Sequence, residues 1–200
     1  MTERVFLRPG RSEAVDVLAA AFHDYPVMRF VLKDAGAAYD ERLRALVGFF
    51  CDVRLTRDFP LVGLREDGAL VAVAGINDPE PGPWPPALQA AWQATGNALG
   101  RDAFDRLARF EAASAASQPT TPHYFLGIIG VRPAYQGQGF ARALIDELIR
   151  MSDAHPRSTG IYLTTEHAAN LPVYRRFGFE VIDEHDVEGL HTWAMFRANR

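Results

Sequence analysis

The chain has 200 residues, of which 48% are hydrophobic, and it carries a formal net charge of −4. This length and composition suit one folded domain over residues 1–200 and exclude a disordered chain. The acidic balance provides no bulk attraction to nucleic acid or to acidic membranes, so we expect neither as a partner. Cys51 is the single cysteine, which excludes a disulfide framework, and no apolar run approaches the ~18 residues of a membrane span. We therefore expect a cytoplasmic protein.

The first half of the chain predicts a strand, two helices and a hairpin. Apolar residues recur at helical spacing on both sides of Tyr25-Pro26, where the proline interrupts the pattern because it disfavours helix at the preceding residue. The tripeptide Glu66-Asp67-Gly68 separates two apolar runs and is typical of a hairpin turn. In chain order we expect a strand at 4–8, helices at 12–22 and 39–54, and strands at 61–65 and 69–76.

The second half begins with an insertion at residues 78–122, which is proline-rich at 78–86 and helical, in two pieces, at 87–116. We interpret it as an insertion because it is too short and too poor in large aliphatic residues to form its own core. The remaining elements are expected at 123–131 (strand), 137–154 (helix), 160–165 (strand), 170–177 (helix), and 179–185 and 191–197 (strands). This order predicts a mixed α/β fold in which the strands at 123–131 and 160–165 are parallel, because a helix connects them.

The most informative motif is VRPAYQGQGFAR at residues 131–142, where a strand passes through a glycine-containing loop into a helix. The first N–H groups of a helix point outward at the positive end of its dipole, so such a loop can hold a phosphate. Gly137 and Gly139 suit this role because glycine adopts positive φ and lets a ligand approach closely. The motif is neither a P-loop nor a dinucleotide fingerprint, since it lacks Gly-Lys-Ser/Thr and a third glycine.

Residues 136–141 (QGQGFA) instead resemble the acyl-CoA pyrophosphate loop of the GNAT superfamily of N-acetyltransferases. Residues 170–179 (NLPVYRRFGF) resemble the block that packs along the pantetheine and thiol of CoA in that superfamily. With the element order, these motifs most resemble the branch that contains puromycin N-acetyltransferase. The resemblance implies a GNAT fold, with a mostly antiparallel sheet, a parallel and splayed pair of fourth and fifth strands, and the helical insertion between the third and fourth strands.

One position departs from that branch. Its fifth strand often reads Tyr-Leu-Glu-Thr, whereas this chain reads Tyr162-Leu-Thr-Thr-Glu166. Side chains alternate along a strand, so a shift of two positions keeps the carboxylate on the same face but moves it ~6–7 Å. Alternatively, Glu166 lies outside the strand.

The resemblance implies acetyl-CoA as the cofactor. The backbone of the fourth strand would pair with pantetheine, and the N–H of Val131 or a neighbour would stabilise the oxyanion. Gly127 and Gly130 indicate a bulge that splays the strands. Tyr174 would protonate the departing thiolate, and Asn170 would bind pantetheine or cap the short helix. The expected cofactor-binding residues are Ile129, Gly130, Val131, Gln136, Gly137, Gln138, Gly139, Phe140, Ala141, Arg142, Asn170 and Tyr174.

The general base is open at this stage. His123 has a suitable ordinary pKa of about 6.5, and Glu166, Glu111 or a chain of waters are the alternatives. The candidate catalytic residues are thus Tyr174, His123 and Glu166.

The break between the first two helices supplies the candidate acceptor-site residues Asp24, Tyr25 and Phe30. Trp84 and Trp92 in the insertion either cover the acceptor cleft or anchor the insertion. We assign no metal ligands.

These observations predict an acetyl-CoA-dependent N-acetyltransferase that acts on a primary amine of a small molecule by direct attack in a ternary complex. The alternatives are a protein acetyltransferase acting on an N-terminus or lysine, and a non-catalytic acyl-CoA-binding module. A monomer and a homodimer are both compatible with the sequence.

Overall fold

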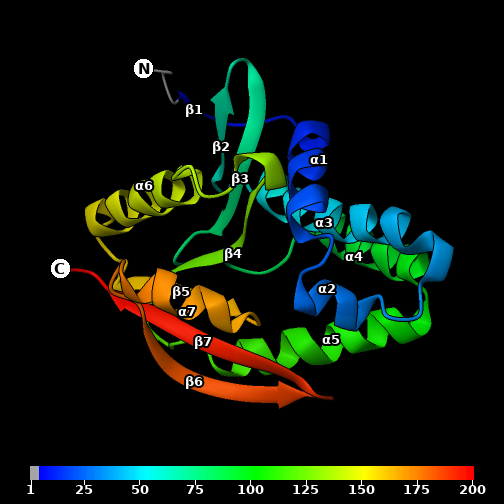
Figure 1. Ribbon diagram of the computed structural model, residues 1–200. Helices are drawn as coiled ribbons and strands as arrows, with labels where there is room; N and C mark the ends of the chain where they lie inside the picture. The colour runs from blue at the N-terminus through cyan, green and yellow to red at the C-terminus, as the bar shows by residue number, and fades with distance from the viewer. Residues whose placement is uncertain (1–4) are drawn as a thin grey trace.

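The computed structural model describes residues 5–200, with side chains from residue 8 onward, and within this range the strands form one seven-stranded sheet (Figure 1). The sheet order is β1-β2-β3-β4-β5-β7-β6. The strands are β1 (Val5–Leu7), β2 (Leu61–Glu66), β3 (Ala69–Asn77), β4 (Tyr124–Val131), β5 (Gly160–Thr165), β6 (Glu180–Val187) and β7 (Leu190–Ala198). The helices are α1 (Arg11–Phe22), α2 (Pro26–Val31), α3 (Tyr39–Thr56), α4 (Pro86–Leu99), α5 (Arg101–Ala116), α6 (Phe140–Ala154) and α7 (Leu171–Arg175).

The mixed α/β order expected from the sequence is confirmed, with differences at element ends. α2 was not expected as a helix; it begins at Pro26, whose fixed φ suits the first position of a helix. α6 begins at Phe140 rather than at 137, because Gly137 and Gly139 have φ of +75° and +83°. The first predicted strand included Arg4, which lies outside the described residues.

The sheet is antiparallel except between β4 and β5, which are parallel as expected. Among the described residues these two strands pair only at Tyr124↔Ile161 and Phe125↔Tyr162, and they separate beyond that point. The register between β3 and β4 shifts at Gly127, where Ile76 faces Leu126 and Gly75 faces Ile128. This bulge and the short pairing confirm the splayed pair of strands.

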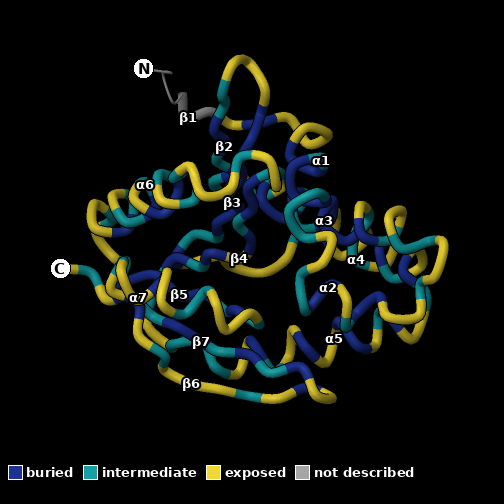
Figure 2. Tube along the Cα trace, in the orientation of Figure 1, coloured by how far each residue is buried: buried dark blue, intermediate teal, exposed yellow. Residues whose placement is uncertain are grey.

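Two apolar clusters cover the two faces of the sheet. One joins α1, α2, α3 and α5 to Val73 and Ile128, and the other joins α6 and α7 to Ala72 and Ala74. Neighbouring residues of β3 thus enter different clusters, as the two-residue period of a strand requires. Figure 2 shows that β3 and β4, which lie between the helices, are largely buried.

The insertion between β3 and β4 packs on the first cluster through Leu99, Leu107 and Phe110. Its aromatic residues also meet the third helix, since the ring of Phe49 lies 5.1 Å from that of Trp92 and 5.8 Å from that of Trp84. The two predicted helices are present, and Gly100, with φ of +82°, separates them.

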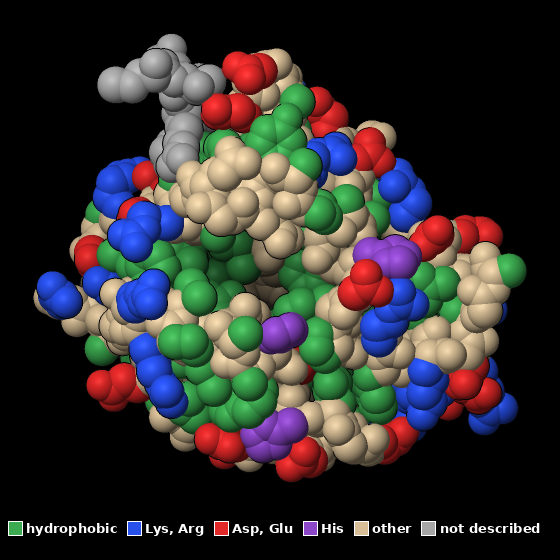
Figure 3. All heavy atoms as spheres, viewed as in Figure 1, with side chains coloured by type: hydrophobic (Ala, Val, Ile, Leu, Met, Phe, Trp, Pro, Cys, Tyr) green, Lys and Arg blue, Asp and Glu red, His purple; other side chains and the backbone are tan. Residues whose placement is uncertain are grey.

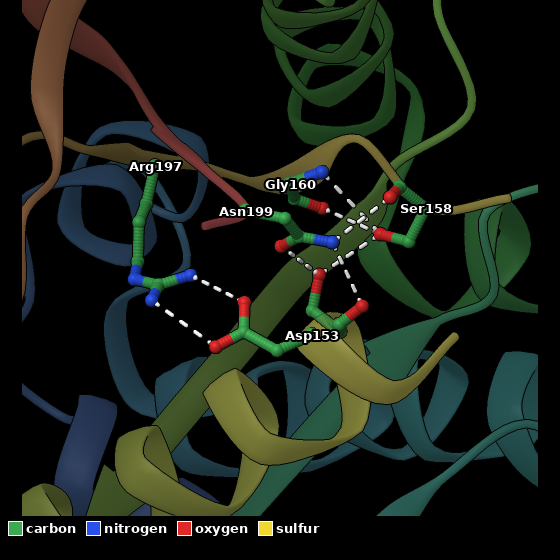
Figure 4. A network of polar contacts seen from close by, with 6 residues as sticks. Asp153, Ser158, Gly160, Arg197 and Asn199 are labelled. Carbon is green, nitrogen blue, oxygen red and sulfur yellow. Dashed lines mark hydrogen bonds and ion pairs between the residues drawn. The ribbon is translucent and has the colours of Figure 1, made fainter. Parts of the chain in front are cut away.

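A polar network joins the end of β7 to the C-terminal end of α6 and the start of β5 (Figure 4). Asn199 donates from Nδ2 to the carbonyl oxygens of Ser152 and Ser158, each at 2.8 Å, and its Oδ1 accepts from Ser152 Oγ. Arg197 lies beside these residues and donates to Asp153 on α6. The last residues of the chain therefore hold α6 against the sheet.

Candidate active site

A cavity of about 260 Å³ lies where β4 and β5 separate, and α1 to α5 provide its other walls. Figure 3 shows that this face of the molecule is hollowed near its middle, in the region of β4, and that hydrophobic side chains surround the hollow. The aromatic residues that line the cavity are Phe22, Tyr25, Phe49, Phe50, Trp84, Trp92, Phe110, Phe125 and Tyr174. The polar residues that line it are Arg54, Asn77, Glu111, Ser114, Thr164, Glu166 and Asn170.

Glu166 follows the last residue of β5, so it lies outside the strand. Glu166 and Thr164 both line the cavity, as residues two positions apart should. Its Oε1 atom is buried and makes no hydrogen bond within the described residues. Burial raises the pKa of Glu166 to about 8, and the nearby charge of Glu111 acts in the same direction. This carboxyl group can therefore exchange a proton near neutral pH.

The Tyr25 hydroxyl lies at the centre of a set of hydrogen bonds that fixes the end of β5. It shares a hydrogen bond of 2.9 Å with Thr165 Oγ1 and accepts the backbone N–H of Glu166 at 3.4 Å. Asn170 donates from Nδ2 to Thr165 Oγ1 at 3.0 Å and makes no side-chain cap on α7. Tyr25 and Asn170 thus position the backbone from which Glu166 projects.

Tyr174 projects from α7 into the cavity and is buried. Its ring packs 5.7 Å from that of Phe179. Burial raises the pKa of its hydroxyl, and the charge of Glu166 adds to this effect. The phenol is therefore protonated at neutral pH and can donate a proton.

Arg54 and Glu111 bring opposite charges to the cavity from α3 and α5. Arg54 is almost fully buried, and burial lowers its pKa to about 10. Two glycines leave room for it, because a Cβ atom on Gly127 would overlap Nη2 and one on Gly75 would lie 3.3 Å from Nε. Loss of solvation by the surrounding protein raises the pKa of Glu111, yet part of its surface remains accessible to solvent. We attribute this combination to its position on the cavity wall, where water still reaches it.

The loop before α6 is exposed at Gln136, Gly137 and Gln138. Gln136 donates from Nε2 to the carbonyl oxygen of Val131 at 3.2 Å, which ties the loop to the end of β4. A side chain at Gly137 would meet nothing within 4 Å, so the space beside this residue is open. Phe140 is buried under the first turn of α6, Ala141 is half-buried, and the Arg142 guanidinium lies 5.7 Å from the ring of Phe177.

The structure brings some of the predicted residues together and leaves others apart. Tyr25, Ile129, Glu166, Asn170 and Tyr174 line one cavity, as do Trp84 and Trp92, which also pack on Phe49. Gly130 and Val131 are buried one and two residues further along β4.

Of the predicted catalytic and acceptor-site residues, three lie outside the set that lines the cavity. Asp24 is exposed and pairs with Arg29, whose hydrogen bond lowers the pKa of Asp24. The ring of Phe30 lies 5.7 Å from the Lys33 ammonium group. His123 contacts the carbonyl oxygen of Thr121 through Nδ1 at 2.7 Å, and its ring packs against Tyr162 and Phe196.

Sequence reasoning missed Arg54, Asn77 and Ser114. The sequence did contain a sign of Arg54. Leu46, Phe50 and Arg54 follow one another at four-residue spacing, so they lie on the same, otherwise apolar, side of α3. A charged residue on such a row is unusual, and it indicates a polar site within the core.

Comparison with known proteins identifies the class of this fold. The acetyltransferase (GNAT) family model matches residues 19–179, more than half of the chain, and the chain therefore belongs to that family. A curated relative, the N-alpha-acetyltransferase RimI of Mycobacterium tuberculosis, is 32% identical over 102 residues. The match covers 49% of this chain and 62% of that relative, so the chain spans less than two thirds of its length.

Solved structures support the fold over the whole chain. A histone acetyltransferase HPA2-related protein from Corynebacterium glutamicum matches with a TM-score of 0.67 and 22% identity, covering 100% of this chain and 98% of that one. Arylalkylamine N-acetyltransferase 2 from Aedes aegypti matches with a TM-score of 0.64 and 13% identity, covering 99% and 100%. In the described part of the chain, no helix has the length and apolar character needed to cross a membrane.

Proposed function

We propose that this chain is an acetyl-CoA-dependent N-acetyltransferase that acetylates a primary amine of a small molecule in a ternary complex. The observation that carries the proposal is the cavity at the separation of β4 and β5, with Glu166 and Tyr174 on its wall. Its volume of about 260 Å³ is close to the lower end of the ~300–1,000 Å³ typical of small-molecule sites.

The residues at this site fit acetyl-CoA in two respects. Gly137 and Gly139 have the positive φ angles, and Gly137 has the open space beside it, that a phosphate-binding loop before a helix requires. Beyond Phe125, β5 pairs with none of the described residues of β4, so this edge of β4 can accept an extended ligand as an added strand. When bound there, acetyl-CoA would supply an acetyl thioester.

The backbone of β4 offers a donor for the negative charge that develops on the carbonyl oxygen. Arg132 donates its N–H to Val71 on β3 at 2.8 Å. Successive N–H groups of a strand point to opposite edges, so the N–H of Val131 is directed away from β3, toward the gap. Losing one such donor typically raises the barrier by about 3 kcal/mol.

Two side chains would move the protons. Glu166, with a pKa of about 8, would accept a proton from the ammonium group of the acceptor, directly or through water. The neutral nitrogen would then bond to the acetyl carbon, the carbon–sulfur bond would break, and Tyr174 would protonate the sulfur. The nitrogen would lose its second proton in the same step, and that proton would restore the phenol of Tyr174. Tyr25 and Asn170 would hold the backbone of Glu166 in place.

The cavity favours a small acceptor over a protein. Trp84, Trp92 and Phe110, all from the insertion, narrow the space in which a peptide would have to lie. The resemblance of the motifs to the branch of puromycin N-acetyltransferase, an enzyme named for a small-molecule acceptor, supports the same choice. Acetylation of a protein N-terminus is the second candidate, because the curated relative is named an N-alpha-acetyltransferase.

Thiol release from acetyl-CoA, measured with a panel of small primary amines and with peptides that have free N-termini, tests the proposal. We expect turnover with one or more small amines and little with peptides. Turnover with peptides alone would favour the second candidate. Binding of acetyl-CoA without turnover of any acceptor would indicate a non-catalytic acyl-CoA-binding module.

A further inference from the structure

Arg54 differs from the other buried arginines of the described residues. Arg106 pairs with Asp34 at 2.9 Å, and Arg197 pairs with Asp153 at 3.1 Å. Arg54 is only 3% exposed, yet no carboxylate of the described residues lies within ion-pair distance of it. Its Nη1 donates to the carbonyl oxygen of Phe50 at 3.0 Å, and its Nε makes no hydrogen bond there. The charge of Glu111 acts on Arg54 from beyond ion-pair distance. A buried guanidinium without an anion in direct contact is costly, so a bound anion would stabilise it.

Unpartnered polar atoms gather around the same cavity. Of the buried side-chain atoms that make no hydrogen bond within the described residues, four belong to residues that line it. These atoms are Arg54 Nε, Asn77 Oδ1, Ser114 Oγ and Glu166 Oε1. Native proteins satisfy nearly all buried polar groups, and a cluster of exceptions at one cavity indicates a polar ligand.

The charges around the cavity are of both signs. Glu111 and Glu166 can face the positive end of an acceptor, whereas Arg54 can face only a negative end. The charge of Glu111 already acts on Arg54, although the two form no ion pair. An acceptor with an amine alone would therefore leave the Arg54 guanidinium without an anion in direct contact. An acceptor that carries both an amine and a carboxylate would match both signs.

The rest of the wall is apolar. Phe49, Trp84 and Trp92 form a packed aromatic group with ring centroids 5.1 to 6.1 Å apart. These rings offer contacts to an apolar side chain and no charge that would hold a polar one.

We infer that the acceptor is a free amino acid with an apolar side chain, whose carboxylate binds Arg54 while its amine faces Glu166. This inference rests on the proposed function and names the acceptor class of the same site. The reaction is the transfer described above: the amine nitrogen gains the acetyl carbon and loses a proton, and the sulfur of CoA gains a proton. The carboxylate remains ionised throughout and serves only to orient the amine.

Matched acceptors that differ by one carboxylate test the inference. We would measure kcat/KM for thiol release with L-phenylalanine against 2-phenylethylamine, L-leucine against 3-methylbutylamine, and L-methionine against 3-(methylthio)propylamine. We expect each amino acid to exceed its amine by about tenfold or more, because a buried bond to a charged group is worth that ratio. Equal or better turnover of the amines would overturn the inference and leave the proposed function standing. Turnover of none of the six would also overturn the inference, and turnover of other small amines in the wider panel would then still support the proposed function.

Variants of two arginines on α3 test whether Arg54 causes the preference for amino acids over amines. Arg54→Met should lower turnover of the amino acid far more than turnover of its amine, and Arg54→Lys should recover part of the preference. A purely structural role of Arg54 would instead reduce both to the same extent. Arg44→Met is the matched control, since Arg44 lies on the same helix and pairs with Asp16 outside the cavity. If Arg54→Met does not fold, the wild-type ratios alone decide the inference.

Discussion

Gly127 and Arg54 occupy adjoining space, so that a Cβ atom on Gly127 would overlap the Nη2 atom of the arginine. Gly127 is the bulged residue of β4 and has accessible surface. Because Gly127 has no side chain, the long buried side chain of Arg54 on α3 can pass β4 and reach the cavity.

Replacing Gly127 by alanine should displace the guanidinium group and reduce stability by about 1–3 kcal/mol, the usual range for overpacking. Urea unfolding of Gly127→Ala, Arg54→Ala and the double variant would measure the coupling between the two positions. We expect the alanine at 127 to cost much less when Arg54 is already shortened. Additive effects would show that the two side chains do not compete for space.

The pH dependence of catalysis should follow Glu166. A base with a pKa of about 8 is active only when deprotonated, so kcat/KM should rise between pH 6 and pH 9 and then level off. Glu166→Gln should lower kcat/KM by about 10²–10⁴-fold and remove this rise. An unchanged profile in the variant would transfer the role of the base to another group, such as Glu111.

The same carboxyl group should affect stability. Unfolded glutamate loses its proton near ~4.3, whereas Glu166 in the folded protein holds it to about 8, so the folded state binds more protons between these values. The free energy of unfolding should therefore fall as the pH rises through that window. Denaturant unfolding at several pH values should show a shallower fall for Glu166→Gln than for the wild type.

Tyr174→Phe removes the proposed proton donor and keeps the ring. We expect kcat to fall by about 10²-fold or more, with little change in the binding of acetyl-CoA, because the hydroxyl acts on the departing sulfur. Steady-state kinetics and thermal shift together would show this. Tyr39→Phe is the control, since its hydroxyl donates to the carbonyl oxygen of His23 and lies outside the cavity. Equal kinetics for both variants would exclude Tyr174 as the acid.

Acetyl-CoA should raise the melting temperature, because a ligand at a hundredfold excess over its Kd stabilises the folded state by about 2.7 kcal/mol. Gly139→Glu should abolish this rise, since it adds a side chain and a negative charge to the proposed phosphate loop. Gly189→Glu, in the β6–β7 turn with φ of +89°, imposes a similar backbone strain far from the loop. The control should melt earlier but keep the full shift; loss of the shift in both variants would contradict the loop assignment.

Asn199→Ala should reduce stability by about 1–3 kcal/mol, because it leaves buried Ser152 with fewer partners at the end of α6. Urea unfolding would measure the loss. Asn97→Ala on the exposed side of α4 should have little effect or stabilise slightly, since alanine favours helix. Equal stability of the two variants would show that the terminal network contributes nothing.

The parts of the fold that local chemistry specifies could be predicted from the sequence. The hairpin at Asp67-Gly68 and the loop at Gly137 and Gly139 need positive φ, which few residues adopt. The parallel pairing of β4 and β5 could also be predicted, because a helix connects the two strands. α2 was missed because a helix of six residues shows too little periodicity to stand out.

The site was predicted where one motif carries it and missed where distant elements meet. Tyr174 belongs to the motif at 170–179, which the resemblance to a known family covers, and Glu166 lies four residues before that motif, displaced from the position that the branch favours. Arg54 was missed and Glu111 was named only as an alternative base, because the two come from helices whose relative position depends on packing. Asp24 and Tyr25 are neighbours in sequence, yet only Tyr25 lines the cavity, because a turn directs adjacent side chains to different sides.

The short pairing of β4 and β5 has a consequence for the life of the protein in a cell. On the proposed function, the substrate itself completes the edge of β4, so the folded state gains free energy whenever acetyl-CoA is plentiful. Proteases act on transiently unfolded chains, and a difference of 1–2 kcal/mol changes protein abundance several-fold. The amount of this enzyme would then follow the metabolic supply of acetyl groups without any change in its synthesis.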